Sequence, residues 1–372
     1  MSHANREPWA ANRLGLDYVE EAERLGPPVR PIIDGHLHVN GGRAAGVFRR
    51  VMDLYGIDRL YTQTQLASAS AVREVLGDRV SFVAIPEYMA EDRERAMTVG
   101  FLENLDVWAN EFGARCVKLW QAPRLKDFVE QAGGDWDDHR MDGPWRVRIA
   151  ERACELGMML MTHVADPDTW FATEYKDSAR YGVKLDHYAP WERMMERFDV
   201  PWLGAHLGGW PEDLEFLTGL LERHPKLFLD TSATKWIVRE ISRHPRDELL
   251  AFMTRFKDRI IFGSDIVTHD DHLVPSPEGE KKFGAELASN EDEAFELYAS
   301  RYWALRTMWE TDYEGESSIA DPDLAKLDPD RYDAMSAPRL RGKSMPRDLL
   351  KVFYGGACEG TLGKWYADHG SR

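Results

Sequence analysis

Two histidines separated by one residue end an apolar run near the start of the chain. The run spans Pro31–His38 and reads Pro-Ile-Ile-Asp-Gly-His-Leu-His, a composition typical of a β-strand. Because successive side chains of a strand point to opposite faces, His36 and His38 point to the same face. Two imidazoles on one face are half of the ligands that a tetrahedral metal site needs. The Asp34-Gly35 pair predicts a point where the backbone bends or passes close to another segment.

Further candidate ligands stand at the ends of later apolar runs. These are His163, His206 and Asp265. Imidazole nitrogens together with a carboxylate suit zinc or a similar divalent metal, with one position left open for water or substrate. The alternatives are buried, hydrogen-bonded histidines and, for Asp265, a cap of a following helix or loop. The shared position at the ends of apolar runs favours a metal site.

Eight short apolar runs separated by helical patterns are predicted to be strands. They span residues 29–39, 59–65, 80–86, 114–120, 158–164, 201–207, 226–232 and 259–265. Helix starts are predicted at Pro144, at Pro211–Asp213 and at Pro245. Strands that alternate with helices indicate a parallel sheet, and eight such units fit a closed (β/α)8 TIM barrel of the α/β class. In that fold the carboxyl ends of the strands face one pocket, which would bring the candidate ligands together.

We expect one large domain. Residues 1–28 are a polar lead-in, and residues 29–372 would form a single barrel domain. An aromatic insertion at 166–198, after strand five, would form a lid over the barrel mouth, and a second insertion spans 267–346, after strand eight. A final helix from Pro346 to about Trp365 is predicted to seal the outside of the barrel.

The composition excludes several classes of partner. A formal net charge of −17 argues against binding to nucleic acid or to an anionic membrane. No apolar run approaches the roughly 18 residues of a membrane span, and the first residues lack the apolar segment of a signal peptide. The three cysteines show no CxxC spacing. We therefore expect a cytoplasmic protein that acts on a small molecule, and an acidic barrel with long insertions is compatible with a homodimer.

Four motifs, in this order, resemble the metal-dependent amidohydrolase superfamily. They are Asp34–His38, Thr162-His163, Ala205–Gly209 and Phe262–Asp265. The chain is most similar to the amidohydrolase-related branch, which includes aminocarboxymuconate-semialdehyde decarboxylase and resorcylate decarboxylases. The resemblance runs from about residue 32 to residue 265, with a fainter part at 350–362.

The resemblance implies a mononuclear site with one divalent metal, most simply Zn2+, with Mn2+ or another divalent ion as the alternative. The implied ligands are His36, His38, His163 and Asp265. The implied activity is hydrolysis by a metal-activated water, with His206 as the acid/base and Asp265 orienting the water.

Two other functions stay open. One is a non-oxidative decarboxylase that uses the same site, and the other is a catalytically silent binding barrel. The decarboxylases usually follow the strand-eight aspartate with an aromatic-proline pair, whereas this chain has Ile266-Val267, which weakens that alternative.

Five residues are candidates for binding the substrate: Lys118, Arg301, Arg306, Gln63 and Trp120. Lys118, at the end of strand four, could hold a carboxylate or, when carboxylated as in binuclear members of the superfamily, bridge two metals; the mononuclear branch favours the unmodified lysine. The two arginines could clamp a carboxylate or form surface ion pairs. These residues and the aromatic insertion predict a small, carboxylated or aromatic substrate.

Two more features have simpler interpretations. Asp230, at the end of strand seven, is expected to orient a ligand histidine or the backbone rather than to bind metal. His269 and His272 could form a second metal site, but a solvated loop is the favoured interpretation.

Overall fold

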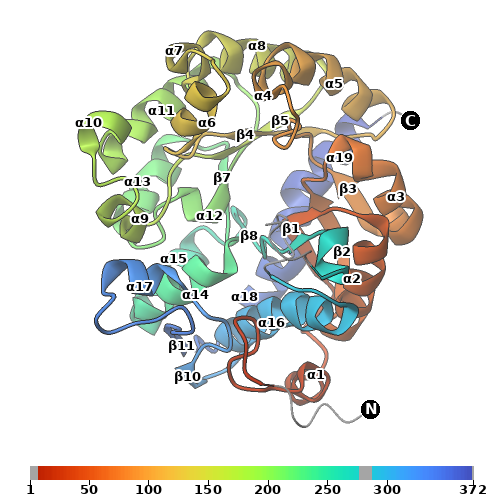
Figure 1. The fold of residues 1–372 in the computed structure, drawn as a ribbon, viewed down its shortest axis with the longest axis vertical. Helices are drawn as coiled ribbons and strands as arrows, with labels where there is room; N and C mark the ends of the chain where they lie inside the picture. Colours follow the sequence, from red (N-terminus) through yellow and green to blue (C-terminus); the bar gives the residue numbers. More distant parts are fainter. Residues whose placement is uncertain (1–6, 276–286, 371–372) are drawn as a thin grey trace.

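The computed structural model describes residues 7–275 and 287–370. Eight parallel strands form its inner layer, surrounded by helices (Figure 1). The strands are β1 (Ile32–Val39), β2 (Ile57–Thr62), β3 (Val80–Phe82), β4 (Cys116–Trp120), β5 (Met159–His163), β6 (Trp202–Gly204), β7 (Leu227–Asp230) and β8 (Ile260–Ile261). Each lies within or overlaps its predicted segment, so the eight predicted strands are confirmed, although most are shorter than predicted.

Backbone hydrogen bonds join these strands into a ring. β3, β2 and β1 pair in one sheet, and β4 to β8 pair in order in another. A parallel bridge between Ala84 and Val117 connects β3 to β4. On the opposite side, Gly35 N–H donates to Phe262 O, with an N···O distance of 2.9 Å, and connects β1 to β8. The predicted (β/α)8 barrel is therefore confirmed.

The junction of β1 and β8 explains the glycine of the first motif. A Cβ at Gly35 would lie 2.7 Å from Ile261 Cγ2, which is too close for any other residue without a shift of the neighbouring strand. The prediction of a close backbone approach at Asp34-Gly35 is confirmed.

The outer layer consists of helices that follow the strands. Its main members are α2 (Gly42–Tyr55), α3 (Leu66–Leu76), α5 (Val99–Asn110), α8 (Pro144–Glu155), α11 (Tyr188–Arg197), α13 (Leu214–Arg223), α14 (Thr234–Arg243) and α15 (Arg246–Arg255). As predicted, Pro144 opens α8, the Asp213 carboxylate caps α13 and Pro245 precedes α15. Between this layer and the strands lies the main core, which includes the fully buried Trp108 and Trp191.

Shorter elements connect these helices. They are α4 (Arg93–Met97), α6 (Leu125–Gln131), α7 (Trp136–His139), α12 (Ala205–Gly208) and the 3-10 turn η1 (Gly77–Arg79). The segment after β5 contains α9 (Asp168–Ala172), α10 (Ser178–Tyr181) and η2 (Lys184–His187) before α11.

The segment after β8 adds a layer of its own. It contains β9 (Val267–Thr268), η3 (Asp270–Leu273), α16 (Glu291–Glu310), β10 (Glu314–Glu316), α17 (Asp323–Leu327) and β11 (Arg339–Arg341). β9 extends the pairing of β1, and α16 packs against α2, α14 and the N-terminal α1 (Tyr18–Leu25). Although α16 has 20 residues, neither it nor any other described helix is apolar enough over a sufficient length to cross a membrane.

The C-terminal segment closes the amino-terminal end of the ring. It runs through α18 (Arg347–Lys351), the π-helical turns η4 (Val352–Gly356) and η5 (Glu359–Gly363), and α19 (Lys364–His369). Ala357, Cys358 and Leu362 pack against side chains from the interior of the ring, such as Ile33 and Met159. The prediction that the final helix seals the outside of the barrel is therefore wrong. The helix covers one end of the barrel, because its apolar face meets the inward-pointing residues of the strand starts.

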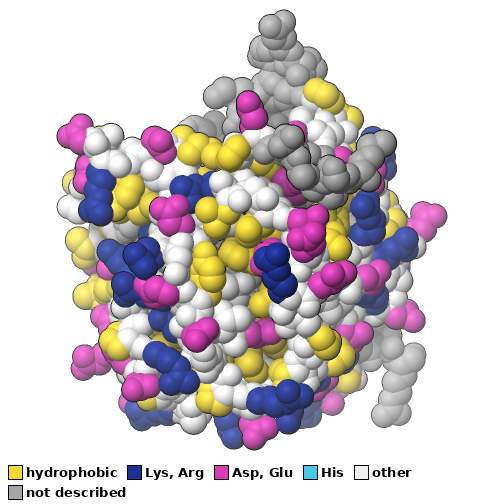
Figure 2. Space-filling model, turned by 90° about the horizontal axis from the view of Figure 1, so that it is seen from below, with side chains coloured by type: hydrophobic (Ala, Val, Ile, Leu, Met, Phe, Trp, Pro, Cys, Tyr) yellow, Lys and Arg dark blue, Asp and Glu magenta, His cyan; other side chains and the backbone are white. Residues whose placement is uncertain are grey.

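Charges are mixed on the surface. On the face seen in Figure 2, the visible acidic and basic side chains are interspersed and do not form a patch of one sign.

Candidate metal centre

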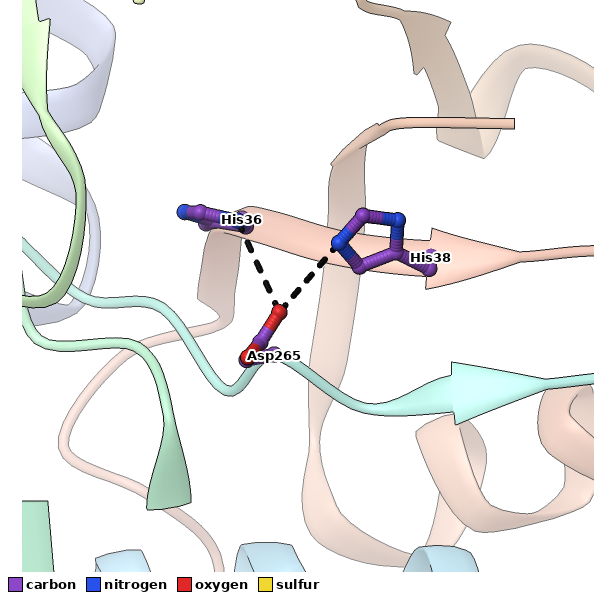
Figure 3. A group of neighbouring side chains, drawn as sticks. All are labelled: His36, His38 and Asp265. Atoms are coloured by element: carbon purple, nitrogen blue, oxygen red, sulfur yellow. Dashed lines mark ion pairs between the residues drawn. The ribbon is translucent and has the colours of Figure 1, made fainter. Parts of the chain in front are cut away.

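Three predicted ligands converge at the carboxyl end of the barrel (Figure 3). β1 supplies His36 and His38, and the loop after β8 supplies Asp265. Asp265 Oδ1 lies 3.6 Å from His36 Nε2 and 3.3 Å from His38 Nε2. All three potential ligand atoms lie within 4.8 Å of one another.

The spacing of these atoms fits a divalent metal. In a tetrahedral site with bonds of about 2.0 to 2.1 Å, neighbouring ligand atoms lie roughly 3.3 Å apart. A direct hydrogen bond between nitrogen and oxygen would be shorter, at about 2.9 Å. Two imidazole nitrogens and a carboxylate oxygen are also the donor types that zinc and manganese accept. His36, His38 and Asp265 are therefore the residues that would hold the metal.

A buried carboxylate sets the proton positions on two histidines. The Asp230 carboxylate accepts a hydrogen bond from His36 Nδ1, at 2.8 Å, and another from the Ser232 hydroxyl. Because that hydroxyl proton is used, Ser232 Oγ accepts the proton of His206 Nδ1, at 2.8 Å. Both imidazoles thus carry hydrogen on Nδ1 and present the lone pair of Nε2, as a metal ligand or a base requires.

Asp230 is held in its charged form. Burial by itself raises the pKa of this carboxyl, but the neighbouring His36 and His206 and the Ser232 hydroxyl hold the pKa below its ordinary value. The backbone N–H groups of His206 and Ser232 also donate to Asp230 Oδ1, each at 3.0 Å. As predicted, Asp230 orients a ligand histidine and the backbone.

Two of the site residues have left-handed backbones. His206 and Asp265 both have φ of 57°, a region that residues other than glycine rarely adopt. Such strain persists where surrounding contacts over-determine the conformation. At β6 the turn continues to Gly209, where a Cβ would lie 2.4 Å from Ala165 O.

His206 is a buried base candidate. Burial, followed by the nearby charge of His163, keeps its pKa well below the ordinary value. Because Ser232 occupies Nδ1, Nε2 is the nitrogen available to exchange a proton with a substrate. His206 lies at the carboxyl end of β6, with its ring centroid 4.9 Å from that of His36.

His163 lies beside His206 and not among the three converging ligands. Its Nε2 lies 2.8 Å from Asp166 Oδ1, and the same carboxylate accepts a hydrogen bond from the Tyr175 hydroxyl. Its ring centroid is 4.5 Å from that of His206. Of the described residues, the groups whose ligand atoms lie within 4.8 Å of one another do not include His163. Its role as a ligand stays a prediction, and Nδ1 is the nitrogen left for it.

Lys118 and Gln63 belong to the same polar cluster. Lys118 Nζ lies 2.8 Å from His36 Nε2 and 2.8 Å from Gln63 Oε1. Burial lowers the pKa of this lysine. The ammonium donates to the lone pair at which a metal would bind, so Lys118 faces the candidate metal position and not the outer pocket.

Two other predicted substrate contacts lie elsewhere. Trp120 packs against Tyr88 and Phe128, with ring centroids 5.6 and 5.4 Å away. Arg306 is fully buried, where it pairs with Glu310 and donates to Gly26 O. The prediction that Arg306 clamps a substrate is therefore corrected, because its guanidinium is consumed in tying α16 to the N-terminal segment.

A cavity of about 280 Å³ lies beside Asp265, which is one of its lining residues. The predicted Arg301 lines it. Its other polar and aromatic lining residues are Trp170, Thr234, Lys235, Trp236, Tyr298 and Asp323. Lys235 and Trp236 were missed in the sequence, although they follow the carboxyl end of β7 by only a few residues, where pocket residues of a barrel are expected.

The prediction that His272 lies in a solvated loop is wrong. This side chain is fully buried, and its Nδ1 lies 2.8 Å from the Tyr298 hydroxyl. The loop folds back on α16, which sequence spacing alone could not indicate.

Comparisons with known proteins were made for sequence and structure. No protein-family model matches the chain, and no curated protein sequence matches it. Among solved structures, 5-carboxyvanillate decarboxylase from Novosphingobium aromaticivorans, complexed with manganese and a nitrobenzoic acid, is 10% identical. Its alignment covers 92% of this chain and 97% of the decarboxylase, with a TM-score of 0.44.

Two further similar structures have comparable scores. An amidohydrolase from Burkholderia multivorans with bound zinc is 14% identical, with 90% and 99% of the chains covered and a TM-score of 0.40. The 2,6-dihydroxybenzoate decarboxylase from Rhizobium is 12% identical, with 87% and 99% covered and a TM-score of 0.40. The barrel fold of this chain is established by its own ring of backbone hydrogen bonds.

Proposed function

We propose that the chain is a mononuclear, metal-dependent hydrolase of the amidohydrolase type. The observation that carries this proposal is the convergence of His36, His38 and Asp265 at separations suited to one divalent metal. The orientation of His36 by Asp230 supports it, because ligand histidines usually donate their other ring N–H to a carboxylate.

The chain's own residues would divide the chemistry between them. When bound, the metal supplies Lewis-acid activation of a water and of a substrate carbonyl. His206 accepts a proton at Nε2 and returns it to the leaving group. Asp265, whose pKa is held well below its ordinary value by His206 and His38 despite burial, remains a carboxylate that orients the attacking water.

We also propose a small-molecule substrate and a cytoplasmic location. The acidic net charge supports the absence of nucleic-acid and anionic-membrane partners. The volume of the cavity, about 280 Å³, is close to the roughly 300 Å³ at which the range of small-molecule sites begins.

The test is the metal content per chain. Elemental analysis would compare the wild type with the double variant His36→Ala/His38→Ala. The control is His224→Ala/His244→Ala, which removes two histidines outside the converging ligands. We expect about one equivalent of metal in the wild type and the control, and a loss of at least ninety per cent in the first variant.

Each other outcome has a definite meaning. No metal in the wild type after incubation with Zn2+ or Mn2+ would overturn the proposal. Two equivalents would replace the mononuclear site by a binuclear one, with Lys118 as the bridge. Release of CO2 from an aromatic acid, without consumption of water, would identify a decarboxylase with the same metal site.

A further inference from the structure

The cavity beside Asp265 contains two cationic side chains from different elements. Lys235 is the second residue of α14, and Arg301 lies in the middle of α16. Arg301 Nη1 donates to Leu297 O and to Ser300 Oγ, at 2.9 and 2.8 Å. Within residues 7–275 and 287–370, neither cation forms an ion pair.

The electrostatics of both groups are those of cations without a counter-ion. Burial lowers the pKa of Arg301 to about 10. Burial, followed by the charge of Arg301, lowers the pKa of Lys235, and Asp321 and Asp323 offset this only in part. Half-buried cations that lack a counter-ion cost free energy, part of which a bound anion would recover.

The start of α14 opens on the same cavity. Ala233 precedes the helix with φ of 68°, and no side chain caps the helix by a hydrogen bond. Ala233, Thr234 and Lys235 all line the cavity. The first N–H groups of a helix have no partner inside it, and the helix dipole favours negative charge there. The Thr234 N–H already donates to Ser264 O, at 3.4 Å, so it is the dipole of this ten-residue helix that adds a third attraction for an anion.

Two indole rings form a fixed wall of the cavity. Trp170 and Trp236 lie with ring centroids 5.6 Å apart at an interplanar angle of 73°. Both indole N–H groups donate to Asp323 Oδ2, at 2.8 and 3.1 Å. Asp323 is also close to Lys326 and Arg239, at 3.4 and 3.7 Å. Its charge is therefore largely engaged by these groups, and it offsets the charge of Lys235 only in part.

We propose that this cavity is a subsite for a small organic anion with a flat apolar body. The charge lies between Lys235, Arg301 and the start of α14, and the body lies against Trp170 and Trp236. That this anion is the substrate rests on the proposed function. That the cavity binds such an anion does not.

The origin of the two cations bears on how the bound anion would be oriented. They come from α14 and α16, whereas the metal ligands come from β1 and the loop after β8. The anchoring charges are therefore residues separate from the candidate ligands, and in this proposal the reacting group lies next to Asp265. Asp265, which lines the same cavity, would repel a second carboxylate, and this favours an uncharged reacting group.

The probes for this subsite are benzoate and its neutral isostere benzamide. Both would be titrated into the purified protein, and tryptophan fluorescence would be measured, with the protein metal-loaded and after chelation. The variant is Lys235→Met/Arg301→Met, which removes both charges and keeps apolar side chains. Arg223→Met/Lys226→Met removes the same charge from exposed positions. Lys235→Arg keeps the charge at the subsite.

We expect the wild type, the surface control and Lys235→Arg to bind benzoate at least tenfold more tightly than benzamide. In Lys235→Met/Arg301→Met the preference should fall to about twofold or less, and thermal melting would verify that this variant is folded. If it is not, the single Lys235→Met variant should lose most of the preference that Lys235→Arg keeps.

Equal affinity of the wild type for both probes, or an unchanged preference in Lys235→Met/Arg301→Met, would overturn the subsite. The chelated samples separate this result from the metal proposal. Benzoate preference without metal uptake would overturn only the hydrolase, and metal uptake without benzoate preference would overturn only the subsite.

Discussion

A single carboxylate, Asp230, determines how two catalytic candidates present their nitrogens. It accepts from His36 directly and controls His206 through the Ser232 hydroxyl. Nothing in the sequence spacing of these residues indicates that they share one hydrogen-bond network. The proposed metal binding at His36 and proton transfer at His206 would therefore both depend on Asp230.

Asp230→Asn should therefore weaken metal binding without removing a ligand. An amide in place of the carboxylate turns an ionic acceptor of the His36 proton into a neutral one, and loss of such partners lowers metal affinity by about 10- to 100-fold. Competition with a chromogenic chelator would measure this affinity. The exposed Asp199→Asn is the matched control. An affinity within twofold of the wild type would show that Asp230 does not orient the ligand.

At the scale of elements, the turn that follows β6 holds His206 in place. Four consecutive residues, 206 to 209, have positive φ, and two of them are glycines. Gly209 lies against the Ala165 carbonyl of the neighbouring loop after β5. The two strand ends that carry His206 and His163 are thus packed backbone to backbone.

Gly209→Ala should destabilise the protein, whereas Gly46→Ala should stabilise it. At Gly209, φ is 79° and an added Cβ would lie 2.4 Å from Ala165 O, so we expect a loss of roughly 1 to 3 kcal/mol. Gly46 lies within α2 with open space around its Cβ position, so alanine should add about 0.5 to 1 kcal/mol. Urea unfolding would measure both. A neutral Gly209→Ala would mean that the turn relaxes freely.

The sequence predicts the barrel and the ligands on its strand ends far better than the residues supplied by the insertions. His36, His38 and Asp265 could be found because strand periodicity and the barrel rule together place them. Asp323 could not, since it reaches the pocket from a segment more than fifty residues beyond β8. Arg306 was misplaced because the face that an arginine takes on α16 depends on packing against α1 and α2, which periodicity does not describe.

At the scale of the whole molecule, the segment after β8 makes stability depend on pH. His272 is buried against Tyr298, and burial, followed by the charge of His269, lowers its pKa to about 4. In the unfolded chain the pKa would be near 6.5. Between these values the unfolded state binds the proton and the folded state does not, so stability falls as the pH falls.

His272→Gln should reduce this dependence. Between pH 7 and pH 4, the free energy of unfolding of the wild type should fall by at most about 3 kcal/mol more than that of the variant. Urea unfolding at pH 7 and pH 5 would measure it, with the half-buried His244→Gln as control. If the variant loses as much stability on acidification as the wild type, His272 is not the group responsible.

The C-terminal helix across the amino-terminal end of the ring affects how substrate enters and product leaves. Leu362 and its neighbours fill that end, so a molecule can reach the metal ligands from the carboxyl end, through the cavity beside Asp265. If substrate and product both pass through this cavity, they use the same opening. A product that remains in the cavity would exclude the next substrate, so product inhibition would be competitive. Turnover would then depend on the rate of product release.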